Sequence, residues 1–181
     1  MLTITVPASE YYNQAEDKFY SLSKPQTIVL EHSLVSISKW ESIWHKPFLS
    51  EDKKTLEESI SYARCMTLTQ NVKPEVYNFL SRENFKDINA YIEDPMTAST
   101  VTDIKKGGRQ KEVVTSELIY YWMIALNIPM KCEKWHLNRL LMLVRICEAK
   151  QEPAKKMSQG EIMRNNRALN AARRKASGSR G

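Results

Sequence analysis

Residues 30–49 read LEHSLVSISKWESIWHKPFL, and the other predicted elements are arranged around this stretch. On a helix its apolar residues recur every three or four positions and form one stripe. The stripe comprises Leu30, Leu34, Ile37 and Trp44, and it is widened by Trp40 and Ile43. Pro47 ends the helix, because proline has no backbone N–H for the next helical hydrogen bond. We therefore predict a helix over residues 32–46 with a large apolar surface.

The composition favours a helical protein. The chain has 181 residues, enough for one domain with a core that needs no disulfide or metal. Only five residues are glycine, whereas helix-forming residues are common, and this argues against a turn-rich β-sandwich. We expect a mainly α (α+β) fold.

The positive charge is concentrated near the C-terminus. The formal net charge is +6, and residues 150–181 hold nine lysines and arginines but only two glutamates. The residues before them are therefore close to neutral. We predict a helical globular domain at 1–150 and a basic helical or flexible tail at 151–181.

A small β element is expected at the N-terminus. Residues 1–6 alternate apolar and polar side chains, and residues 26–30 read as a second strand, so the two are expected to pair antiparallel. The polar stretch SEYYNQAEDK lies between them. Residues 97–115 predict a β-hairpin, because β-branched residues flank Lys-Lys-Gly-Gly-Arg. A loop without regular structure is the alternative for that segment.

Helices account for the rest of the globular part. Ser50 is the predicted N-cap of a helix that ends near Leu68. That helix is expected to bury Leu56, Ile60, Ala63 and Met66 or Thr67. Pro74 opens a short helix, and another is expected over 82–93.

Residues 115–150 form the most apolar part of the chain, and they predict a pair of helices. The first begins at a cap on Thr115 or Ser116 and reaches Leu126, and the second runs from about Cys132 to Lys150. The faces expected to point inward are Leu118, Trp122 and Ala125 on the first helix, and Trp135, Leu140, Leu141, Val144 and Cys147 on the second. We expect this pair to be the hydrophobic centre.

No membrane or secretory segment is expected. The longest apolar run, residues 118–128, is too short to span a bilayer. The N-terminus has no basic region followed by a long apolar one. Cys65, Cys132 and Cys147 have no disulfide-framework spacing, which suits reduced thiols in a reducing cytoplasm.

The sequence carries no catalytic signature. Cys132 and His136 are spaced to share a helix face, but no CxxC or HxxxH partner accompanies them, so no metal site is expected. No element orders a Cys–His nucleophile pair, and no phosphate-binding glycine motif is present. We expect a protein that is not an enzyme and has no cofactor.

The basic tail allows two interpretations. Arg164, Arg167, Arg173, Arg174 and Lys175 lie on a predicted helix over 159–175, which opens with a capping box at Ser158 and Glu161. Phosphate contacts would give sequence-independent nucleic-acid binding, although no aromatic residue follows Trp135 to stack on bases. Docking to an acidic or apolar helical partner is the favoured alternative.

Three segments carry a resemblance to a known family: residues 30–49, TSELIYYWMIALNIPMKCEKWHLNRLLMLVRIC at 115–147 and KKMSQGEIMRNNRALNAARRK at 155–175. In order and spacing they resemble tail assembly chaperones of long-tailed bacteriophages. The resemblance implies a non-enzymatic protein of the host cytoplasm. Such a protein coats the tape-measure protein while the tail forms and is absent from the finished virion. It also allows self-association.

The resemblance assigns a partner-binding role to aromatic side chains. Trp40, Trp44 and Phe48 are candidate contacts, because aromatic anchors dominate the energies of protein interfaces. For Trp44 and Phe48 a place in the core is the favoured alternative. Two other functions remain open: nucleic-acid binding through the basic helix, and a structural role as a head–tail connector subunit.

Overall fold

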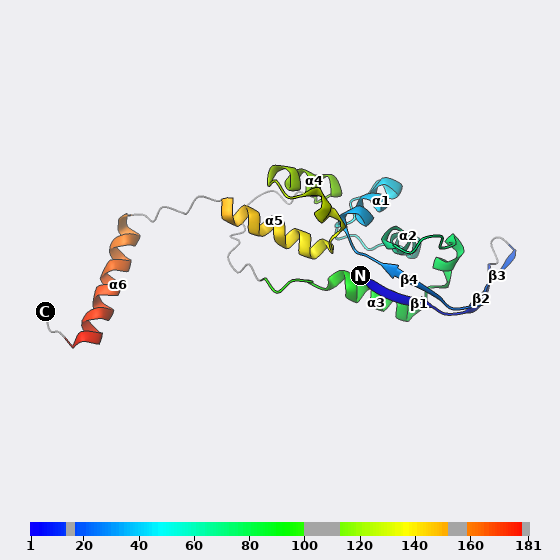
Figure 1. Ribbon diagram of the computed structural model, residues 1–181, viewed down its shortest axis with the longest axis horizontal. Coiled ribbons are helices and arrows are strands. Elements are labelled where there is room, and N and C mark those ends of the chain that lie inside the picture. The colour runs from blue at the N-terminus through cyan, green and yellow to red at the C-terminus, as the bar shows by residue number, and fades with distance from the viewer. Residues whose placement is uncertain (14–16, 100–112, 152–158, 179–181) are drawn as a thin grey trace. The chain divides into compact units, whose positions relative to one another are not determined.

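The computed structural model describes residues 1–13, 17–99, 113–151 and 159–178 (Figure 1). The chain divides into two compact units, Met1–Cys147 and Glu148–Gly181, which we treat separately. Helices dominate, and a small sheet lies at the N-terminus, so the predicted mainly α (α+β) fold is confirmed.

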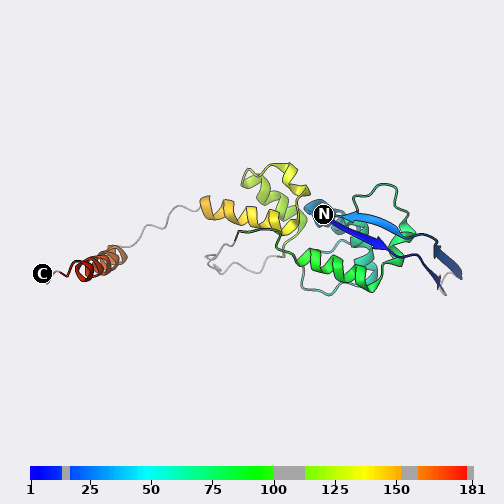
Figure 2. The ribbon, with the colours of Figure 1, turned by 60° about the horizontal axis from the view of Figure 1, so that its bottom comes forward.

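An antiparallel ribbon opens the first unit. β1 (Leu2–Val6) pairs with β4 (Gln26–Leu30), as predicted. The polar stretch between them folds into a second pair, β2 (Ser9–Asn13) and β3 (Lys18–Leu22), which the sequence reasoning missed. Both views show the ribbon leading away from the helices, with β2 and β3 at its far end (Figures 1 and 2).

The two halves of the ribbon are offset by one residue. Residues 7–8 separate β1 from β2, whereas residues 23–25 separate β3 from β4. Three residues therefore oppose two, the imbalance that bends and twists a ladder at a β-bulge. Pro7 and Pro25 lie at this break, where a missing N–H costs no ladder hydrogen bond.

α1 (Leu34–Trp44) is the helix predicted over residues 32–46, and it is two residues shorter at each end. Ser33 caps its start, and the Ser33 and Ser36 side chains each accept a hydrogen bond from the other residue's backbone N–H, at 3.3 and 2.9 Å. Its end comes at His45, whose φ of 52° is left-handed, two residues before the predicted stop at Pro47.

α2 (Leu56–Met66) begins later than predicted. Its N-cap is Thr55 and not Ser50, because Thr55 and Glu58 form a reciprocal capping box. Ala63 and Met66 are buried as expected, but Leu56 is exposed because it lies in the first turn, outside the core.

A 3₁₀ helix, η1 (Pro74–Phe79), and α3 (Arg82–Glu93) follow at the predicted positions. α3 packs against β1, and the Asn84 side-chain amide donates to the Thr5 carbonyl oxygen at 3.2 Å. Most of the hairpin predicted for 97–115 lies outside the described residues. Its described flanks, 97–99 and 113–115, contain no strand.

The apolar region forms α4 (Ser116–Ala125), a short η2 (Met130–Lys134) and α5 (Leu137–Gln151). Thr115 caps α4, one of the two predicted caps. The second predicted helix is split, since Trp135 and His136 interrupt it. The inward face of α4 was also predicted wrongly: Ile119 and Met123 are buried, whereas Ala125 is exposed and Leu118 and Trp122 are only partly buried.

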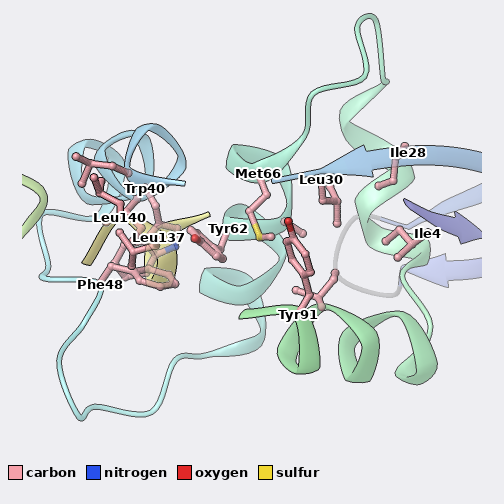
Figure 3. Close-up of a cluster of buried hydrophobic side chains, with 14 of the residues drawn as sticks. Ile4, Ile28, Leu30, Trp40, Phe48, Tyr62, Met66, Tyr91, Leu137 and Leu140 are labelled. Atoms are coloured by element: carbon pink, nitrogen blue, oxygen red, sulfur yellow. The ribbon is translucent and has the colours of Figure 1, made fainter. Parts of the chain in front are cut away.

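The core is built around α1, which packs against α2, α4 and η2. The predicted hydrophobic centre at 116–150 therefore contributes one side of the core and not its middle. Figure 3 shows Trp40, Phe48, Leu137 and Leu140 together at one end and Ile4, Ile28 and Leu30 at the other. Tyr62, Met66 and Tyr91 lie between these groups (Figure 3).

In the second unit, α6 (Gln159–Ser177) covers the predicted basic helix. Ser158, the capping residue of the box predicted with Glu161, lies outside the described residues. No helix in the described parts of the chain is long and apolar enough to cross a bilayer.

Candidate interaction surfaces

The aromatic side chains near the end of α1 lie mainly in the core. Trp40 is 1% exposed and Phe48 is 6% exposed, and their rings meet edge to face at 5.2 Å (Figure 3). The Trp40 indole N–H donates to the Glu58 carbonyl oxygen at 2.9 Å. These two rings therefore stabilise the fold and leave almost no surface for a partner.

Trp44 differs from its two neighbours because it is only partly buried. Its indole N–H donates to the Ser61 hydroxyl oxygen at 3.0 Å, which fixes the ring along α2. Of the three predicted aromatic contacts, Trp44 is therefore the one that is not fully buried.

Two lysines stabilise the segment between α1 and α2, residues 45–55. Lys54 donates to the Phe48 carbonyl oxygen at 2.7 Å, and its ammonium lies 4.2 Å from the Phe48 ring centroid. Burial lowers the pKa of Lys54. Lys46 donates to the Glu58 carboxylate at 2.7 Å, and this hydrogen bond is the main cause of the lowered pKa of Glu58.

Glu41 is a structural residue that sequence reasoning missed. It is buried, and its two carboxylate oxygens accept the backbone N–H groups of Phe48 and Ser116, each at 2.8 Å. Ser116 is the first residue of α4, so the carboxylate satisfies a helix N-terminal donor and faces the positive end of the dipole. Since Glu41 and Ser116 are 75 residues apart, no local motif signals this contact.

Two buried histidines meet where α1 and α5 begin. The rings of His32 and His136 lie 5.1 Å apart, and His32 Nδ1 is hydrogen-bonded to the Tyr62 hydroxyl. The backbone joins the same segments, because Leu137 N–H donates to the His32 carbonyl oxygen at 2.8 Å. Burial, reinforced by the neighbouring His136, lowers the pKa of His32 to about 3.

The hydrogen bonds of His136 define its tautomer. Nε2 lies 2.9 Å from the Tyr91 carbonyl oxygen and must donate to it, whereas Nδ1 accepts from the Asn138 N–H at 3.3 Å. A third hydrogen bond, from the Tyr91 hydroxyl to Glu31 at 2.8 Å, continues the buried polar network.

This network is not arranged for metal binding or nucleophilic catalysis. Within the described residues, no three histidine, cysteine or carboxylate side chains gather as metal ligands. Cys132 lies in η2, whereas His136 lies just before α5 and outside both helices, contrary to their predicted common helix face. Burial raises the pKa of the Cys65 thiol, the opposite of what activates a cysteine nucleophile.

α4 exposes apolar side chains to solvent. Tyr121 is 64% exposed and Ile124 is 67% exposed, although the helix is among the most apolar of the chain. The two residues are three apart and share a face. A helix that is apolar on all sides is ordinarily covered on all sides, so the outer face of α4 is a candidate protein contact.

The predicted basic residues of α6 are at its surface. Arg164, Arg167, Arg173 and Arg174 are exposed, and Lys175 lies in the same helix. Met163 and Leu169 are exposed as well. These basic residues and the three aromatic candidates belong to separate units of the chain.

Comparison with known proteins gives no further guide, because no protein-family model, curated protein or solved structure matches the chain.

Proposed function

We propose that this protein is a non-enzymatic tail assembly chaperone of a long-tailed bacteriophage, which binds the tape-measure protein in the host cytoplasm. The proposed client comes from the resemblance of residues 30–49, 115–147 and 155–175 to that family. The structural observation that supports a binding role is the exposed apolar face of α4, formed by Tyr121 and Ile124.

An exposed helix face suits a helical client. A long helical protein carries apolar stripes that aggregate when uncovered, and a second apolar helix can cover such a stripe. Burying two large side chains contributes roughly 3–6 kcal/mol, which is comparable with the entropic cost of association. Each copy would therefore bind weakly, and shielding of a long client would require many copies and would remain reversible.

Co-expression tests this proposal. The protein is produced together with the tape-measure protein encoded by the same phage, and the soluble fraction of the client is measured. The intact protein should increase that fraction and co-purify with the client. The double variant Tyr121→Ser/Ile124→Ser should lose both effects, because it removes the apolar contact.

A matched control separates the α4 face from general surface apolarity. Leu56 is exposed on α2 to a similar degree, so Leu56→Ser should retain client binding. The proposal fails if the client stays insoluble with the intact protein, or if Leu56→Ser is as defective as the α4 variant. Detection of the protein in purified virions would instead support the head–tail connector role, and light scattering tests self-association.

A further inference from the structure

α6 is a strongly basic helix. Its 19 residues include five lysines and arginines and one glutamate. Arg164, Arg167 and Arg174 lie at helix positions i, i+3 and i+10, so they fall within an arc of about 80° at 100° per residue. All three are exposed, and they extend over about 15 Å of helix. The helix thus presents one arginine-lined face.

The apolar surface of α6 is too small for a stable protein interface. Met163 and Leu169 are its exposed large apolar side chains among the described positions. A specific protein interface usually takes roughly 20 or more residues from each partner, with a central apolar cluster. Charge is therefore the main source of binding energy, which favours a polyanion over an apolar protein groove.

The small apolar surface of α6 and its lack of aromatic residues also distinguish between the classes of polyanion: membranes, single strands and double strands. A helix that lies on a lipid surface normally places tryptophan, phenylalanine or leucine on a broad apolar face, and α6 has one leucine and no aromatic residue. Proteins that bind single strands stack bases on aromatic rings, which α6 also lacks. Contacts with the phosphates of a double helix need neither feature.

We propose that α6 binds double-stranded nucleic acid without sequence preference, through the arginine face of Arg164, Arg167 and Arg174 on the phosphate backbone. The helix is narrow enough to lie in the major groove of B-DNA, which is about 12 Å wide. Three to five phosphate contacts give a slope of log affinity against log salt between about −2.7 and −4.5. This activity is independent of the proposed client, because it needs only the second unit.

Fluorescence anisotropy with a labelled 20-base-pair DNA duplex tests the inference on the full chain. Raising NaCl from 50 to 200 mM should weaken binding at least about 40-fold, as three phosphate contacts require. Two duplexes of unrelated sequence should bind equally. The triple variant Arg164→Ala/Arg167→Ala/Arg174→Ala should lose this binding, and alanine should not unfold α6, since it has the highest helix propensity.

Two controls make the result specific. The variant Lys53→Ala/Arg82→Ala/Lys86→Ala removes the same charge from exposed positions of the first unit and should bind like the parent chain. The triple arginine-to-lysine variant keeps the charge and should retain binding within a few-fold. Equal losses from the first-unit variant and the α6 alanine variant would overturn the inference.

Other ligand classes provide the remaining outcomes. The inference is also overturned if phosphatidylserine-containing vesicles or a single-stranded oligonucleotide bind more tightly than the duplex at equal salt. Binding of an acidic helical peptide without duplex binding would overturn it and point to a protein partner. Loss of client solubilisation with duplex binding intact would refute the proposed chaperone function alone.

Discussion

Acidification below pH 6.5 should destabilise the first unit through His32. This side chain is buried, and its pKa is lowered to about 3, compared with about 6.5 in an unfolded chain. Between these values the unfolded chain binds a proton that the folded chain excludes. The stability that the neutral His32 ring contributes is therefore fully present above pH 6.5 and is lost progressively as the pH drops towards 3. At pH 4.5 the loss from this one residue is about 3 kcal/mol.

Urea unfolding at pH 7.0 and pH 4.5 measures this loss. Carboxylates also titrate in this range, among them Glu58, whose pKa is lowered, so the parent chain alone does not isolate the histidine. His32→Gln removes the titrating group, and its loss of stability between the two pH values should be smaller by about 3 kcal/mol. His45→Asn removes an exposed histidine at a left-handed position that asparagine tolerates, and it serves as the control.

Equal pH dependence in the parent and His32→Gln would refute the reasoning. An NMR titration offers a second measurement that does not depend on unfolding. The His32 ring should remain neutral above about pH 4 while the chain is folded.

Two further substitutions test the packing. Glu41→Gln should lower the free energy of unfolding by about 1–3 kcal/mol, because an amide cannot accept both the Phe48 and the Ser116 N–H. Exposed Glu57→Gln should change it little, and urea midpoints compare the two. Leu140→Ala should cost about 2–5 kcal/mol by opening a cavity in the core, whereas Ile124→Ala should cost under about 1 kcal/mol because that side chain is exposed. Thermal unfolding compares this second pair, and equal effects at Leu140 and Ile124 would contradict the assignment of the core.

The sequence predicted a helix well where capping residues or a proline mark its two ends. α3 matched its predicted range because Ser81 caps it and Asp94-Pro95 follows it. α2 was placed too early because Ser50, Glu51 and Asp52 imitate a helix start. Thr55 and Glu58 have the spacing of a capping box, and this pattern in the sequence would have given the correct start of α2.

The inward face of α4 could not be predicted from periodicity. Its residues are apolar on every side, so the spacing of Leu118 and Trp122 selects no direction. Packing against α1 makes the choice and buries Ile119 and Met123 instead.

For the candidate surfaces too, features that depend on neighbouring residues could be predicted, whereas contacts between distant segments could not. The sequence located the basic residues of α6 because charge is visible without a structure. It could not separate Trp40 in the core from Trp44 at the edge, since both fit one helical stripe. The pairing of His32 with His136 depends on segments far apart in the chain, which no local pattern joins.

The one-residue offset in the N-terminal ribbon also limits how the molecule can polymerise. A long, straight outer strand presents a row of backbone donors and acceptors that can template fibril growth. Here β1 and β2 are only five residues each, and Pro7 lies at the bend between them. The C-terminal end of β4 is paired at its free edge, because Leu30 forms a bridge with Thr67 and Val29 accepts from the Leu68 N–H. Tyr12 and Phe19 are exposed at the end of the ribbon and could attract a second molecule. That molecule would find only two short strand edges, β1 and β2, which are out of line with each other.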